Sequence, residues 1–159
     1  MWVGEAVVSR GKILVIDDEP GIVDIVATNL EAEGFEVIGA GDGKAGLRLA
    51  KDQDPDLVIL DIMLPGIDGW EVLRRLEADR TTSGVPVIML TAKVEDTDVL
   101  QGLEGGAVEY VTKPFFPEDL VATVKIHLTV YDRSLRAERR SALIERRRSI
   151  LKRAPRNRG

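Results

Sequence analysis

Residues 57–66 read LVILDIMLPG: four consecutive apolar residues, one carboxylate at Asp61, and a loop that turns at Pro65 and Gly66. An apolar run of this length without alternation is typical of a strand buried on both faces, as in a parallel sheet covered by helices. Asp61 ends that strand, and the turn-forming loop after it leaves the side chain at the surface end of the sheet. The stretch therefore predicts a carboxylate available for chemistry at the end of a buried strand.

The same arrangement, a short apolar run followed by a polar side chain, recurs along the chain. Strand-like segments lie at residues 12–16, 36–40, 57–61, 85–91 and 109–112. Helical patterns lie between them, at residues 20–33, 44–51, 70–78 and, more weakly, 96–103, and a last helix begins at residue 117. This alternation predicts an α/β fold, a flavodoxin-like doubly wound five-stranded parallel sheet in the order 2-1-3-4-5 with an extended C-terminal helix.

Polar side chains at the strand ends form the candidate site. In an open parallel sheet the carboxyl ends of the strands share one rim, and ligands bind there at the switch point between the first and third strands. We therefore expect five side chains to converge at this rim: Asp17, Asp18, Asp61, Thr91 and Lys113. Three carboxylates in one pocket repel one another unless a cation lies among them, and an all-oxygen site with few protein ligands suits Mg²⁺.

Each of these residues also has an ordinary structural explanation. Asp17 and Asp18 can cap the following helix and start a turn before Pro20, while Thr91 and Lys113 are of types common in strands and at strand ends. Their coincidence at one rim favours phosphoryl chemistry instead. A carboxylate beside a metal can act as a nucleophile, and a hydroxyl and an ammonium can contact phosphoryl oxygens.

Charge is divided unevenly along the 159 residues. The net charge is −5, but residues 133–159 contain 11 of the 22 Lys and Arg residues and only 2 of the 27 Asp and Glu residues. This segment therefore carries +9 and the preceding residues −14, which indicates a separate role for the segment. The chain has no Cys, no signal-like start and no apolar run near ~20 residues, so we expect one domain in a reducing cytoplasm.

Four ordered blocks resemble the receiver domain of two-component response regulators over residues 11–130: ILVIDDEP, LVILDIMLPGIDGWEVL, PVIMLTAK and GAVEYVTKPF. The resemblance implies a phosphoprotein of phosphorelay signal transduction, in which Asp61 accepts a phosphoryl group. The donor would be a sensor histidine kinase, a phosphotransfer protein or a small acyl phosphate. The resemblance also implies Mg²⁺ bound by Asp18, Asp61 and the Met63 carbonyl, with Asp17 acting largely through water.

The family pattern further implies a conformational switch. It assigns Thr91 and Lys113 to the phosphoryl oxygens and implies a cis peptide bond between Lys113 and Pro114. When Thr91 moves toward the phosphoryl group, Tyr110 would turn inward and change the face formed by the fourth helix, the fifth strand and the fifth helix. The expected protein is thus a signalling domain that assists its own phosphorylation and dephosphorylation, not an enzyme. His127, among apolar neighbours in the last helix, is expected to be a partly buried structural residue.

Two other functions remain open at this point. A Mg²⁺-dependent aspartyl phosphohydrolase also uses an aspartate nucleophile, but it usually has a second Asp two residues later, where this chain has Met63. A binding module that is never phosphorylated is disfavoured because every position of the motif is filled. Turnover of a phosphomonoester would revive the hydrolase.

The chain is expected to divide into an N-terminal extension (1–10), the receiver domain (11–130) and a basic helical C-terminal extension (131–159). No Gly or Pro lies between Pro117 and Ala154, so the last helix need not end with the domain. The extension fits a helix for homodimerisation or partner docking, a linker to a missing output domain, or, less well, a nucleic-acid arm. Because the apolar heptad seam fails after about two heptads, a short dimer contact, or Arg pairing with the acidic receiver of a second copy, is favoured over a long coiled coil.

Overall fold

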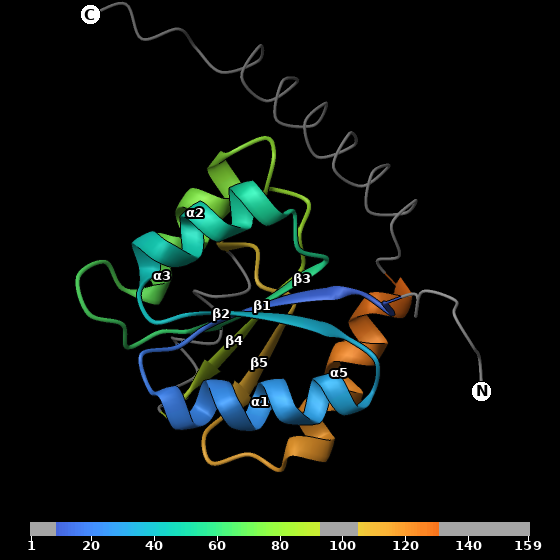
Figure 1. Cartoon of the computed structure of the whole chain (residues 1–159). Helices are drawn as coiled ribbons and strands as arrows, with labels where there is room; N and C mark the ends of the chain where they lie inside the picture. Colours follow the sequence, from blue (N-terminus) through green and yellow to red (C-terminus); the bar gives the residue numbers. More distant parts are fainter. Residues whose placement is uncertain (1–8, 93–104, 131–159) are drawn as a thin grey trace, which may run out of the picture.

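The computed structural model describes residues 9–92 and 105–130, which form an open sheet with helices on both faces (Figure 1). The elements are β1 (Lys12–Ile16), α1 (Pro20–Ala32), β2 (Glu36–Ala40), α2 (Gly43–Gln53), β3 (Leu57–Asp61), α3 (Gly69–Ala78), β4 (Val87–Thr91), β5 (Glu109–Thr112) and α5 (Pro117–Val130). The strands are all parallel and lie in the order β2-β1-β3-β4-β5. This confirms the predicted fold class and strand order.

The strand register brings the carboxyl ends to one level. Ile16 lies beside Leu60 across β1 and β3, Asp61 beside Leu90 across β3 and β4, and Thr91 beside Thr112 across β4 and β5. Residues that follow the strands directly are therefore neighbours at one rim, although they are far apart in the sequence.

Side chains of each strand alternate between two separate hydrophobic clusters. Leu14 and Ile16 of β1 pack on the side covered by α2 and α3, whereas Ile13 and Val15 pack on the side covered by α1 and α5. Figure 1 shows α2 and α3 above the sheet and α1 and α5 below it. The strands are thus buried from both sides, which explains their unalternating apolar sequences.

Local hydrogen bonds decide where the elements begin and end. Oδ1 of Asp42 accepts a hydrogen bond from the Ala45 N–H, so α2 begins at Gly43, before the predicted start, and the helix also runs on past the predicted end to Gln53. Asp68 caps α3 in the same way and starts it at residue 69. Helix α1 ends at residue 32, one residue earlier than predicted, and Gly34 follows with φ +92°.

The prediction that the fourth strand begins at residue 85 was wrong. The N–H of Val85 donates to the Thr82 carbonyl at 3.1 Å and so belongs to a turn, and the first ladder bond, from Val58 N–H, goes to the Pro86 carbonyl. The strand therefore begins at Val87.

The helix predicted at 96–103 and the continuation of the last helix beyond residue 130 lie outside the described residues. Within residues 9–92 and 105–130, no helix has the length and hydropathy needed to cross a bilayer.

Candidate functional site

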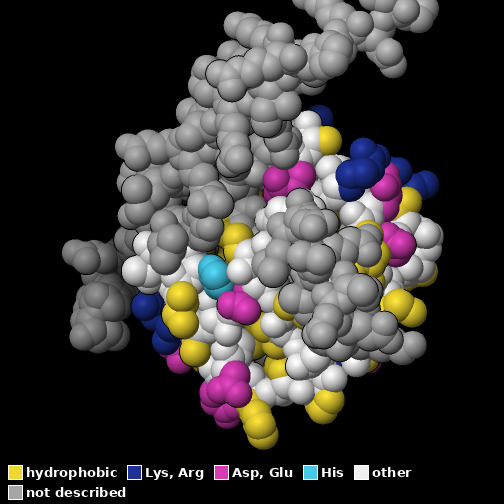
Figure 2. Space-filling view, turned by 180° about the vertical axis from the view of Figure 1, so that it is seen from behind, with side chains coloured by type: hydrophobic (Ala, Val, Ile, Leu, Met, Phe, Trp, Pro, Cys, Tyr) yellow, Lys and Arg dark blue, Asp and Glu magenta, His cyan; other side chains and the backbone are white. Residues whose placement is uncertain are grey.

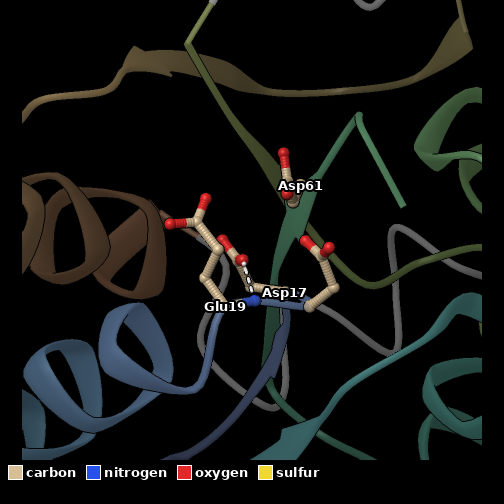
Figure 3. Close-up of side chains that lie close together, drawn as sticks. Asp17, Glu19 and Asp61 are labelled. Atoms are coloured by element: carbon tan, nitrogen blue, oxygen red, sulfur yellow. Dashed lines mark hydrogen bonds between the residues drawn. The ribbon is translucent and has the colours of Figure 1, made fainter. Parts of the chain in front are cut away.

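Four carboxylates meet at the rim between β1 and β3. Asp17, Asp18 and Glu19 follow β1, and Asp61 is the last residue of β3. One oxygen from each lies within 4.8 Å of one oxygen from every other, and Figure 3 shows Asp17, Glu19 and Asp61 side by side. Asp17 and Asp61 are almost completely buried, whereas Asp18 and Glu19 are exposed. The three acids predicted from the sequence are therefore brought together, with Glu19 as a fourth.

Lys113, the residue after β5, supplies the positive charge of the cluster. Its Nζ lies 2.7 Å from Oδ2 of Asp17, 3.2 Å from Oε1 of Glu19 and 3.4 Å from Oδ2 of Asp61. The ammonium is mostly buried, with 11% of its side chain exposed. One cation among four carboxylates leaves the rim with an excess of negative charge.

Backbone N–H groups hold two of the carboxylates in place. Oδ1 of Asp17 accepts a hydrogen bond from the Glu19 N–H at 2.9 Å, and Oδ1 of Asp61 accepts one from the Met63 N–H at 3.3 Å. Asp17 thus shapes the turn before α1, but no side chain caps this helix, so helix capping does not account for Asp17 and Asp18. The loop bond of Asp61 turns its Oδ2 toward Lys113.

The protonation equilibria of the site follow from burial and from these neighbours. Burial raises the pKa of Asp61 and the nearby Asp17 carboxylate raises it further, while Lys113 lowers it, so the pKa lies at about 6 instead of its ordinary value near 3.8. Burial lowers the pKa of Lys113, but Asp17 and Asp61 outweigh this effect and raise it. The ammonium is therefore charged at neutral pH, whereas the ionised form of Asp61 is disfavoured by its surroundings.

The donor set fits a hard divalent cation. Oδ2 of Asp17 is buried and makes no hydrogen bond within the described residues, so it keeps lone pairs for a ligand despite its ion pair with Lys113. All candidate ligand atoms are carboxylate oxygens, the type that Mg²⁺ prefers, and a cation would offset their excess negative charge. These oxygens form the candidate metal centre.

The other predicted site residues lie near this cluster or farther away. Thr91 is buried at the end of β4, and its carbonyl accepts a hydrogen bond from the Lys113 N–H at 2.7 Å. The peptide bond between Lys113 and Pro114 is cis. Tyr110 does not belong to the rim: it lies within β5 beside Met89, half-buried against the hydrophobic cluster under α2 and α3.

Two residues of the site were missed from the sequence. Glu19 was not included, although it follows two rim acids directly and its carboxylate contacts Lys113 at 3.2 Å. Gly69 was also missed: its N–H donates to the Ile62 carbonyl at 2.8 Å, and a β-carbon at this position would collide with the backbone of Asp61 and Ile62. A glycine at the start of a helix gave no sign of this contact, because the approach depends on the loop's path.

The raised pKa of Asp61 predicts a pH-dependent gain in stability when its charge is removed. Between pH 4 and 6 the folded protein binds more protons at Asp61 than the unfolded chain does. Ionisation of this carboxyl group therefore lowers the free energy of unfolding as the pH rises, and the loss is complete above pH 6. In EDTA at pH 7.5, Asp61→Asn should therefore raise the free energy of unfolding by about 2 kcal/mol, and by little at pH 4. Urea unfolding at both pH values measures this difference.

The control is Asp52→Asn, which removes an exposed carboxylate near the C-terminal end of α2 that does not belong to the rim. It should change the free energy of unfolding little at either pH. An equal gain for Asp61→Asn at pH 4 and 7.5, or a loss at pH 7.5, would contradict the pKa assigned to Asp61.

Comparisons with known proteins agree with this geometry. The model of the response regulator receiver domain family matches residues 13–125. The DNA-binding response regulator MtrA of Mycolicibacterium smegmatis is 49% identical over 119 residues, which are 75% of this chain and 51% of that protein. The alkaline phosphatase synthesis transcriptional regulatory protein PhoP of Bacillus subtilis is 48% identical over 114 residues, 72% of this chain and 47% of that protein. The chain thus spans about half the length of these curated relatives.

Solved structures show the same fold. A CheY-like response regulator receiver domain protein from Methanospirillum hungatei JF-1 is 31% identical, with a TM-score of 0.72 over 77% of this chain and 97% of that one. The BeF3-activated DrrB receiver domain is 38% identical, with a TM-score of 0.68 over 75% of this chain and 97% of that one. The family match, the sequence relatives and the shared sheet order lead to one conclusion: the chain belongs to the response regulator receiver domain family.

Proposed function

We propose that this protein is a phosphorylation-controlled signalling switch whose phosphoacceptor is Asp61. The observation that carries the proposal is the position of Asp61 at the end of β3, with its Oδ2 3.4 Å from the Lys113 ammonium and three further carboxylates beside it. A nucleophilic carboxylate, a fixed cation and a candidate metal centre are the parts that phosphoryl transfer to an aspartate needs.

In the proposed reaction, a carboxylate oxygen of Asp61 attacks the phosphorus of the donor. The new O–P bond forms as the bond from phosphorus to the donor's leaving atom breaks, a histidine nitrogen or an acyl oxygen, and an aspartyl phosphate results. Lys113 supplies positive charge to the phosphoryl oxygens, and the Met63 N–H orients Asp61. The Thr91 hydroxyl would donate a hydrogen bond to a phosphoryl oxygen.

Asp17, Asp18, Asp61 and the Met63 carbonyl would hold Mg²⁺, with Asp17 acting largely through water. The bound ion would neutralise phosphoryl charge and align the donor. The burial of Oδ2 of Asp17, which is paired with the Lys113 ammonium, and the close spacing of the carboxylate oxygens support this assignment. Glu19, which was not predicted, is the neighbour that could take over the Lys113 ammonium when the other acids bind a cation.

The switch is proposed to join this rim to the surface around β5 and α5. Thr91 and Tyr110 lie on adjacent strands, because Thr91 pairs with Thr112 and Tyr110 with Met89. Movement of Thr91 toward an added charge of about −1.5 to −2 would let Tyr110 turn inward and change that surface.

The partners are proposed on the same basis. The phosphoryl donor would be a sensor histidine kinase, a phosphotransfer protein or a small acyl phosphate, and the chain would act as a signalling domain. Residues 11–130 would be the receiver domain, and the basic residues 131–159 would serve homodimerisation or partner docking. The other options are a linker to an output domain and, less favoured, contact of these basic residues with nucleic acid; the names of several relatives include DNA binding, as in RpaA of Synechocystis.

Incubation with acetyl phosphate tests the proposal. We expect one phosphoryl group per chain in the presence of Mg²⁺ and almost none in EDTA, and borohydride reduction with mass spectrometry should place it on Asp61. Hydrolysis of a phosphomonoester such as p-nitrophenyl phosphate is measured in parallel. Catalytic turnover of the monoester would favour a phosphohydrolase over the proposed switch. A label on another residue would contradict the assignment of Asp61 as the phosphoacceptor.

A further inference from the structure

The outward surface of α1 and α5 combines acidic and apolar side chains that have no partner in the described part of the chain. Three large hydrophobic side chains are exposed here: Ile25 of α1 is 45% exposed, Ile126 of α5 61%, and Phe116, the residue before α5, 73%. Exposed carboxylates lie among them on the same two helices. We call this surface the α1–α5 face; it comprises Asp24, Ile25, Thr28, Glu31, Phe116, Glu118, Asp119, Ala122 and Ile126.

The negative charge of this face is not balanced locally. Asp24, Glu31, Glu118 and Asp119 form no ion pair within residues 9–92 and 105–130. Helix α1 has no basic residue, and the single lysine of α5, Lys125, is already paired with Glu33 at 2.7 Å.

Basic side chains of the described domain gather on the opposite side of the sheet. Six of them belong to α2, α3 and the residues just after α3: Lys44, Arg48, Lys51, Arg74, Arg75 and Arg80. In Figure 2 most of the dark blue side chains lie at the upper right, on the side of α2 and α3, with magenta side chains next to them, and magenta beside yellow lies at the lower edge, on the side of α5. Acidic side chains also lie on α2, on α3 and just after α3, and three of these basic residues are paired with them, whereas α1 has acidic residues and no basic one.

The chain itself contains a segment of complementary character. Residues 133–159, the Arg-rich segment, carry +9, and leucines and isoleucines are placed among the arginines at positions 135, 143, 144, 150 and 151. Such a segment can place apolar side chains against Ile25 and Ile126 and guanidinium groups against the surrounding carboxylates.

The sequence favours a second copy as the source of this segment. The segment begins three residues after Val130, the last residue of α5, and no Gly, Pro or Asn, the residues that favour tight turns, lies between residues 131 and 154. Reaching the α1–α5 face of its own domain would require the chain to turn back along α5, and the sequence has no turn signal there.

We infer that the α1–α5 face binds the Arg-rich segment of a second copy of this chain, in a reciprocal two-fold dimer. The Arg-rich segment of each copy binds the α1–α5 face of the other, and this two-fold symmetry limits the assembly to a dimer. The inference deepens the self-association proposed above for residues 131–159, and it does not depend on phosphorylation of Asp61.

Cysteine cross-linking in the full chain tests the contact, because the protein has no Cys of its own. Protein carrying Thr28→Cys, in the middle of the α1–α5 face, is mixed with tagged protein carrying Ser141→Cys in the Arg-rich segment. Under mild oxidation at low salt we expect disulfide-linked heterodimers at about tenfold the yield of a control pair that replaces Thr28→Cys with Gln53→Cys on α2. In about 1 M NaCl, where the Debye length falls to about 3 Å, the excess should disappear.

Light scattering of matched charge variants separates the face from self-association in general. Asp24→Asn/Glu31→Gln and the control Glu36→Gln/Asp52→Asn each remove two exposed carboxylates that form no ion pair among the described residues. We expect the dimer dissociation constant to rise about tenfold for the first pair only. Equal effects of the two variant pairs, or equal cross-linking at Thr28 and Gln53, would contradict binding at the α1–α5 face but not self-association. Monomers under all conditions would contradict both the α1–α5 contact and self-association.

Discussion

Asp61→Asn protein should take up no phosphoryl group from acetyl phosphate while keeping its fold. The amide nitrogen and oxygen of Asn match the size of the carboxylate, so the packing at the end of β3 and the Met63 N–H contact can persist. An amide lacks the negative charge and the lone-pair reactivity of a carboxylate, so it cannot form an acyl phosphate. We expect labelling to fall at least about 1,000-fold, that is, below detection by mass spectrometry of the intact protein.

Two controls separate loss of the nucleophile from loss of the site. Asp52→Asn, on the exposed side of α2, should be labelled like the wild type. Lys113→Met should be labelled poorly although Asp61 is present, because the carboxylate loses the cation 3.4 Å from its Oδ2. Undiminished labelling of the Asp61→Asn protein would move the phosphoacceptor to another residue.

Gly69→Ala, at the first residue of α3, should strongly destabilise the packing of this helix against the loop that follows Asp61. A β-carbon at this position would overlap the Asp61 carbonyl oxygen and lie 2.6 Å from the Ile62 α-carbon. Both contacts are with backbone atoms, so a change of side-chain rotamer cannot relieve them and the loop must move. We expect a loss of about 3 kcal/mol in the free energy of unfolding, measured with urea, and slower labelling of Asp61.

The matched control is Gly21→Ala in α1, where a β-carbon would meet no atom within 4 Å. Because Ala favours a helix over Gly, this variant should be equally stable or more stable by up to about 1 kcal/mol. If the two variants had the same stability, the crowding at Gly69 would not constrain the loop. Slow labelling of a stable Gly69→Ala protein would instead separate the position of Asp61 from the stability of the fold.

Much of the fold could be predicted because its signals are local. Strands β1 and β3 are unalternating apolar runs, and their burial in two hydrophobic clusters is what such runs require. Helix ends were less accurate, because a capping bond such as that from Ala45 N–H to Asp42 depends on the path of a few loop residues. The start of β4 was misjudged for a similar reason, since Val85 donates its N–H to a turn.

The candidate site was predictable to the extent that strand order determines it. Once β1 and β3 are adjacent, Asp17 and Asp61 must be neighbours, and the sequence placed both at strand ends. The three contacts of the Lys113 ammonium were not predictable, because a long side chain can reach several acids and the choice depends on distances of a few tenths of an ångström. The close approach of Gly69 to Asp61 was hidden for the same reason.

The ammonium of Lys113 already fills the place of a counter-ion among the rim acids. Were a divalent cation to bind beside Asp17, its charge would repel this ammonium, which lies 2.7 Å from Oδ2 of Asp17 and 3.4 Å from Oδ2 of Asp61. A phosphoryl group on the donor would bring negative charge to both cations, so each ligand would reduce the electrostatic cost of binding the other. Under the function proposed above, the affinities for metal and phosphoryl donor would rise together, and the rim would act as a coincidence detector that responds to the two jointly and weakly to either alone.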